Sequence, residues 1–171
     1  MPCPLAELNA CDLPRFLEVC GPLYEHSPWV AERAFACRPF ASREALHAAL
    51  VAAVAAATAE EQLALIRAHP DLVGRLAREG RLTAASTSEQ ATAGLDALAS
   101  DEIAAFERFN RAYRDRFGFP FVICARENRK EAILAAFPMR LAHTAEQERA
   151  TALAEIGRIG RLRLFDAVSE V

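Results

Sequence analysis

The chain has little of what β-sheets and turns are made from. Its 171 residues include only 7 glycines, 8 valines, 6 isoleucines and 6 threonines, whereas alanine and leucine, which favour helices, are abundant. A hydrophobic share of 53% is too high for a disordered chain, and this length suits one compact domain. We therefore predict an all-α, single-domain bundle of about eight short helices over residues 1–171.

The chain also lacks an excess of positive charge and a long apolar run. A net charge of −3 argues against binding to nucleic acid or to an anionic membrane surface. The Ala-rich stretch at 48–57 is too short to span a bilayer. Because Lys130 is the only lysine, Schiff-base chemistry would depend on this residue alone. We expect a small-molecule substrate or a protein partner, with no nucleic acid and no membrane.

Cysteine and histidine patterns give no sign of a bound metal. The five cysteines are an odd number without C-x-x-C spacing, and no H-x-x-x-H or H-E-x-x-H occurs. This disfavours a disulfide framework and a zinc site, and reduced thiols suit the cytoplasm. The first residues also lack the charged and apolar regions of a signal peptide. We predict a cytoplasmic protein with no metal.

Helix starts are predicted from residues whose side chains cap the free N–H groups of a first turn. These are Asp12, Ser27, Ser42, Thr58, Ser86, Ser100, Asn128 and Thr144. The helix that begins near Ser42 should bury Leu46, Leu50, Val54 and Ala57 on one face.

Proline and glycine mark the places where helices end. Pro70 disfavours helical geometry at His69, so we expect a corner between helices there, followed by a short helix over 71–78. Gly118 should end the helix that begins near Ser100. The apolar run 119–125 is either a lone strand or an extended buried loop. We favour the loop, because no second strand is in view.

Arg163 is the charged residue that the helical pattern directs inward. At 100° per residue it lies only about 20° from Ile156, in the middle of the apolar stripe, whereas Arg158 and Arg161 lie on the solvent side. A buried guanidinium needs an anionic partner, which is either a protein carboxylate or a ligand. A structural ion pair and a functional role are equally compatible with this position.

His69 and Glu89 are the two other candidates for chemistry. A histidine gives and takes protons near neutral pH, although a lone histidine is more often a packed or capping residue. Glu89 completes the capping box Ser86-x-x-Glu89, which needs no further explanation. A carboxylate in the first turn of a helix is also kept ionised there, so both roles are open. Together with an inward Arg163, these residues suit proton transfer on an anionic molecule.

Five segments in order along the chain resemble the 2-oxo-4-hydroxy-4-carboxy-5-ureidoimidazoline (OHCU) decarboxylase family. They are 24–29 (YEHSPW), 65–72 (LIRAHPDL), 86–90 (STSEQ) with 93–95 (AGL), 117–123 (FGFPFVI) and 156–164 (IGRIGRLRL). The resemblance covers essentially the whole chain.

The resemblance implies an all-helical enzyme that converts OHCU to (S)-allantoin and carbon dioxide in urate degradation. It implies no metal or organic cofactor, a homodimer, and functional coupling to the upstream hydrolase that supplies OHCU. Two alternatives stay open. One is a non-catalytic helical module that binds ligands or proteins, and the other is a decarboxylase or hydrolase of a related ureido acid.

The resemblance also assigns roles to individual residues. The family's catalytic residues fall on His69, Glu89 and Arg163, which are the three that the helical pattern and residue chemistry had singled out. Its substrate contacts fall on Pro70, Ser86, Gln90 and the backbone of Phe121, Val122, Ile123, Cys124 and Ala125. Cys124 is expected to be a buried thiol and not a nucleophile.

Overall fold

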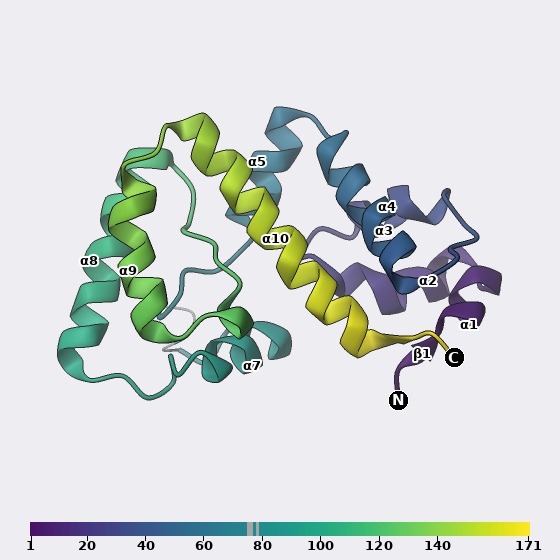
Figure 1. Cartoon of the computed structure of the whole chain (residues 1–171), viewed down its shortest axis with the longest axis horizontal. Coiled ribbons are helices and arrows are strands. Elements are labelled where there is room, and N and C mark those ends of the chain that lie inside the picture. The colour runs from purple at the N-terminus through teal and green to yellow at the C-terminus, as the bar shows by residue number, and fades with distance from the viewer. Residues whose placement is uncertain (75–76, 78) are drawn as a thin grey trace. The chain divides into compact units, whose positions relative to one another are not determined.

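The structure is a computed structural model that describes residues 1–74, 77 and 79–171 (Figure 1). The described residues form nine α-helices, two 3-10 turns and one pair of two-residue strands, which confirms the predicted all-α class. They group into two compact units. Unit 1 comprises Met1–Ala68 and Gly157–Val171, and unit 2 comprises His69–Ile156.

Unit 1 is a small assembly of helices closed by two short strands. Its elements before the final helix are β1 (Cys3–Pro4), α1 (Leu5–Ala10), α2 (Leu13–Cys20), η1 (Gly21–Leu23), α3 (Trp29–Phe35), α4 (Arg43–Ala55) and α5 (Ala59–Arg67), and β2 (Val168–Ser169) comes last. Helix α3 packs against α2 and α4, and β1 pairs in parallel with β2. Neither α1 nor this strand pair was predicted from the sequence.

Three of the four helix starts predicted in unit 1 are confirmed. The side chains of Asp12, Ser42 and Thr58 each accept a hydrogen bond from the backbone N–H three residues on, and Thr58 forms a complete capping box. The prediction for Ser27 is wrong, because its hydroxyl donates to the Glu25 carbonyl at 2.8 Å. Helix α3 instead begins at Trp29, after Pro28.

The core of unit 1 follows the predicted face of α4. Leu46, Leu50 and Val54 are buried as expected, whereas Ala57 lies beyond the end of the helix. Phe16 is fully buried, with its ring centroid 5.3 Å from that of Phe35.

Among its described residues, unit 2 contains the 18-residue helix α8 and three other α-helical segments. Its elements are α7 (Ala84–Thr92), α8 (Ser100–Phe117), η2 (Ala125–Glu127), α9 (Lys130–Leu141) and the first part of α10 (Ala145–Ala167), whose residues from Gly157 onward belong to unit 1. Gly118, at φ 73°, ends α8 as predicted. Thr144 and Gln147 form the predicted reciprocal cap of α10. The predicted start at Asn128 is wrong, because α9 begins at Lys130 and Asn128 donates to the Cys124 carbonyl at 2.9 Å.

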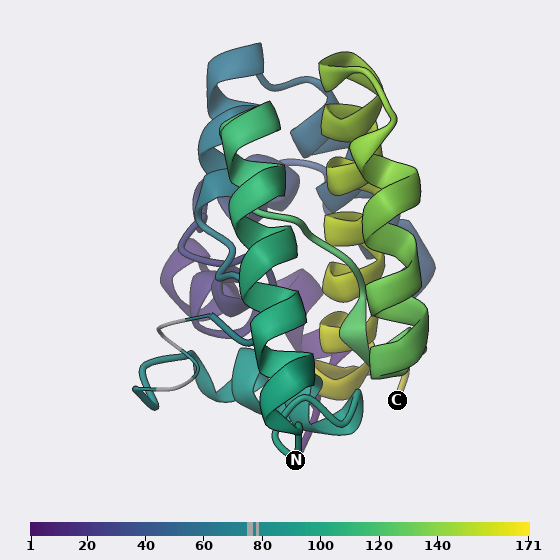
Figure 2. The ribbon, with the colours of Figure 1, turned by 90° about the vertical axis from the view of Figure 1, so that its left-hand side faces the viewer.

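The segment 119–124 has neither helical nor strand geometry, which confirms the predicted loop. It runs between α8 and α9 (Figure 2). Phe121 contacts Tyr113 of α8 with ring centroids 5.3 Å apart, and Phe137 of α9 with centroids 3.9 Å apart. All three rings are fully buried, so this loop is part of the core of unit 2.

Two further expectations concern helices. The predicted helix 71–78 extends outside the described residues, and its described beginning, 71–74, is a turn. Within the described part of the chain, no single helix is long and apolar enough to cross a membrane. The pair α4 and α5, bent by 114°, passes that test together by length and composition only.

Candidate functional site

His69 lies at the predicted corner. Helix α5 ends at Arg67, and His69 follows outside the helix with only 6% of its surface exposed. Pro70, the next residue, is half-buried. The imidazole is therefore held within the protein by a short, non-helical connection.

Two buried amide side chains hold the backbone that follows His69. Asn110 of α8 donates to the Leu72 carbonyl at 2.8 Å, and Gln90 of α7 accepts from the Val73 N–H at 3.1 Å. Val73 has φ 54°, which is strained for a β-branched residue. Such a conformation persists only when its surroundings fix it, and these two hydrogen bonds do so.

Helix α7 begins one turn earlier than the sequence indicated. Thr83 is its cap, with its hydroxyl accepting from the Ser86 N–H at 3.2 Å. The predicted capping box Ser86-x-x-Glu89 is therefore wrong, because both residues lie inside the helix. Ser86 and Gln90, one turn apart, are buried on one face, and Glu89 is half-buried. Capping no longer explains the carboxylate of Glu89.

The backbone of segment 121–125 is hydrogen-bonded to side chains of α9 and α10 at alternate residues. The Val122 carbonyl accepts from Arg140 at 2.6 Å, and the Cys124 N–H donates to Glu155 at 2.8 Å. In contrast, no hydrogen bond of the described residues uses the Val122 N–H or either backbone group of Ile123. Val122 is buried and Ile123 is half-buried, so these backbone groups are available to bind an amide or ureido group.

The thiol of Cys124 is a poor nucleophile. It is 1% exposed, and burial raises the pKa of the Cys124 thiol to about 11. Since the thiolate is the reactive form, this agrees with the predicted inert, buried cysteine.

Arg163 points inward, as the helical pattern predicted. It is 8% exposed, and its Nη2 lies 2.9 Å from Oε1 of Glu25, which is 3% exposed. The required anionic partner is thus a protein carboxylate in unit 1. Glu25 lies in the YEHSPW segment, but it was not predicted as the partner of Arg163. One turn before Arg163, the absence of a side chain at Gly160 leaves room for the buried ring of Tyr24.

The described geometry brings some predicted residues together. In unit 2, Ser86 and Gln90 share one face of α7, and Gln90 is bonded to the corner after His69. Arg163 belongs to unit 1 and is paired there with Glu25. Asn110 and Arg140, which hold the two non-helical segments, were missed because nothing local in the sequence marks them.

Pockets and metal ligands add little to this picture. A pocket of about 330 Å³ in unit 2 is lined by Val73, Thr87 and Gln90 among others. Of the predicted site residues that the structure describes, Gln90 alone lines this pocket. Across the described ranges, no three His, Cys, Asp or Glu side chains are placed to hold a metal ion.

Comparison with known proteins identifies relatives over nearly the whole chain. A family model described as OHCU decarboxylase matches residues 9–165. A 2-oxo-4-hydroxy-4-carboxy-5-ureidoimidazoline decarboxylase from Haloferax volcanii is 45% identical over 165 residues, covering 96% of each chain.

Two other relatives are longer than this chain. The uric acid degradation bifunctional protein PucL of Bacillus subtilis is 40% identical over 164 residues, which is 96% of this chain and 32% of PucL. A crystal structure of (S)-allantoin synthase matches with a TM-score of 0.77 and 30% identity. That match covers 98% of this chain and 54% of the synthase chain.

Proposed function

Because the chain belongs to the OHCU decarboxylase family, we propose that it converts OHCU to (S)-allantoin and carbon dioxide in urate degradation. The observation that carries the proposal is the family match over residues 9–165, together with relatives of 35–45% identity that carry this name. We propose that residues 1–171 work as one domain of this type.

The substrate explains why we propose a reaction without a cofactor. OHCU carries a carboxylate and a hydroxyl on one ring carbon, next to a C=N bond. When the carboxylate leaves as carbon dioxide, its bonding electrons flow into the imine, which is an electron sink within the substrate. The imine nitrogen, which receives these electrons, takes up a proton. The hydroxyl then becomes the ring carbonyl by losing its proton, and the ureido-bearing carbon gains one. The enzyme has to orient the substrate, stabilise charge and deliver that proton to one face.

His69 and Glu89 are the residues that we assign to proton transfer. His69 is buried at a corner, and Glu89 is half-buried in the second turn of α7. We propose that His69, oriented by Glu89, moves protons at the substrate hydroxyl and at the ureido-bearing carbon.

Arg163 is assigned to charge stabilisation. Its guanidinium is desolvated and held by Glu25, which fixes its orientation. A donor directed at developing charge contributes roughly 3–4 kcal/mol to catalysis. A clamp on the departing carboxylate would stabilise the ground state more than the transition state, so the proposed role is at the oxygen and nitrogen atoms that gain charge.

Substrate binding is assigned to three sets of groups. Pro70 lies beside His69, and Ser86 and Gln90 are buried on α7. In the backbone of Phe121, Val122, Ile123, Cys124 and Ala125, the groups of Ile123 complement an amide edge.

The wider setting is also part of the proposal. We propose a homodimer in the cytoplasm. Light scattering coupled to size-exclusion chromatography would test the dimer, and cell fractionation would test the location. The bifunctional name of PucL favours functional coupling to the enzyme that supplies OHCU.

The function is tested by the rate of decarboxylation. OHCU generated freshly from urate in the assay is mixed with the folded protein, and its loss is followed by absorbance at neutral pH. The expected result is a large acceleration over spontaneous decay, which His69→Ala abolishes without changing the far-ultraviolet circular dichroism. A folded protein that gives no acceleration would overturn the proposal.

A further inference from the structure

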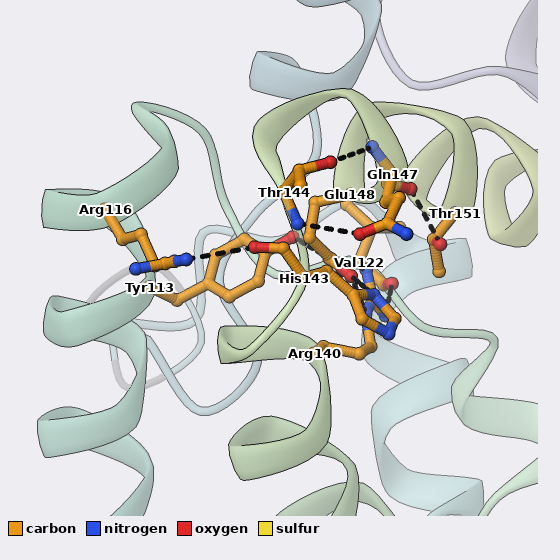
Figure 3. Close-up of polar contacts among 9 residues, drawn as sticks. All are labelled: Tyr113, Arg116, Val122, Arg140, His143, Thr144, Gln147, Glu148 and Thr151. Atoms are coloured by element: carbon orange, nitrogen blue, oxygen red, sulfur yellow. Dashed lines mark hydrogen bonds and ion pairs between the residues drawn. The ribbon is translucent and has the colours of Figure 1, made fainter.

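Tyr113, Arg140 and Glu148, from three helices, and His143, from the connection between α9 and α10, form a polar cluster in unit 2 that the proposed reaction does not use (Figure 3). Glu148 of α10, which is 0% exposed, lies at its centre. Its carboxylate accepts hydrogen bonds from Tyr113 of α8, from Nδ1 of His143 at 2.7 Å, and from Nε of Arg140 at 2.9 Å. Nη2 of Arg140 lies 2.8 Å from the same carboxylate. Every oxygen of this buried anion is therefore satisfied.

Arg140 is the member of the cluster that reaches the loop. While one edge of its guanidinium pairs with Glu148, its Nη1 donates to the Val122 carbonyl at 2.6 Å. Its Cζ also lies 4.2 Å from the ring centroid of Phe121. Arg140 is 7% exposed, so these contacts form away from water. The cluster thus connects α8, α9 and α10 to the first two residues of 121–125.

A lysine could not make both contacts. The guanidinium is planar and presents its donors in fixed directions, so a single Arg140 bonds a carboxylate on one edge and a carbonyl on the other. The other end of the loop is held separately, by Glu155 and Asn128 on the backbone of Cys124. Ile123, which lies between the two anchored residues, has both backbone groups unused by the described residues.

We propose that Arg140 is a positioning residue for substrate binding. Held by Glu148, it fixes the Val122 carbonyl and the Phe121 ring, and so sets the direction in which the Ile123 N–H and C=O meet the ureido and ring amides of the substrate. The inference rests on the proposed function, since it concerns the segment to which substrate binding was assigned. Binding groups that are held rigidly before the ligand arrives lose less entropy on binding.

The test compares Arg140→Lys with Tyr113→Phe. Arg140→Lys keeps a positive charge beside Glu148 but loses the contact with the Val122 carbonyl. Tyr113→Phe removes one hydrogen bond to Glu148 and keeps the ring that packs against Phe121. Steady-state decarboxylation and amide nuclear magnetic resonance spectra of the ligand-free protein are recorded for both. For Arg140→Lys we expect KM to rise about tenfold with kcat within about threefold, as for the loss of binding hydrogen bonds. The Val122 and Ile123 amide resonances should shift.

Tyr113→Phe should leave KM within about twofold of wild type, although it too destabilises the fold. Should Arg140→Lys fail to fold, the pair Arg140→Met with Glu148→Gln removes both charges together and predicts the same rise in KM. An unchanged KM in an active Arg140 variant, or an equal rise in Tyr113→Phe, would overturn the inference. Wild-type protein that does not decarboxylate OHCU would instead refute the proposed function.

Discussion

The pair formed by Arg163 and Glu25 gives a prediction that separates stability from catalysis. The two groups are 2.9 Å apart and 8% and 3% exposed, so neither charge is solvated if the other is removed. Breaking such a buried pair costs about 3–5 kcal/mol. For a chain of this size we therefore expect Glu25→Gln and Arg163→Met each to lower Tm by ~6–20 °C, with the smaller loss for Gln, which still accepts a hydrogen bond.

The double variant carries the decisive comparison. Because Glu25→Gln with Arg163→Met removes both charges of the pair together, its loss of stability should be smaller than the sum of the two single losses by about 2 kcal/mol or more. Its decarboxylation should nevertheless stay about 100-fold or more below wild type, since the proposed charge-stabilising group is gone. Calorimetry and steady-state kinetics on the four proteins measure both quantities. Additive stability losses, or recovered activity in the double variant, would refute the reasoning.

Three further predictions concern stability. Gly157→Ala should stabilise α10 by about 0.5–1 kcal/mol, because the added methyl lies at an ordinary contact distance of 3.7 Å from Val51. Gly160→Ala should destabilise the protein by about 1 kcal/mol or more, because the added methyl would lie 3.0 Å from the buried Tyr24 ring. Chemical denaturation measures both changes. Thr83→Ala should lower the free energy of unfolding by about 1 kcal/mol, because the capping hydrogen bond of α7 is lost. Ala99→Gly, at the start of α8 where no side chain caps the helix, is the control and should show no such loss. Equal losses in the two variants would contradict the assigned cap. Burial raises the pKa of the Cys124 thiol from 9.0 to about 11. Between these pH values the folded state keeps a proton that the unfolded state releases. The free energy of unfolding should therefore fall as the pH rises from 9 to 11. Cys124→Ala should flatten that part of the pH dependence, and an unchanged slope would contradict this assignment.

Local signals in the sequence predicted local structure well. The caps at Asp12, Ser42, Thr58 and Thr144 are confirmed because each depends on residues within one helical turn. The inward direction of Arg163 is confirmed for the same reason, since helical phase follows from spacing alone.

The errors occurred where two signals compete or a partner is distant in sequence. Thr83 and Ser86 are both good caps three residues apart, and the burial of Ser86 against the protein decides for Thr83. Asn128 has the chemistry of a cap but bonds the Cys124 carbonyl instead. Glu25 lies 138 residues from Arg163, so only the folded chain reveals the pair.

The candidate site shows the same division. Residue types and the family resemblance were sufficient to select His69, Glu89 and Arg163, and their catalytic roles stay predictions. The groups that hold the two non-helical segments, Asn110 and Arg140, could not be found from sequence because they act through backbone carbonyls far along the chain.

The stereochemistry of the product tests the central claim most directly. Freshly generated OHCU is allowed to react with the folded wild-type protein at neutral pH, and the allantoin formed is resolved into its enantiomers on a chiral column. Delivery of the proton to one face of the ureido-bearing carbon predicts (S)-allantoin in large excess from the first turnovers. A racemic product that forms at the spontaneous rate would contradict the account.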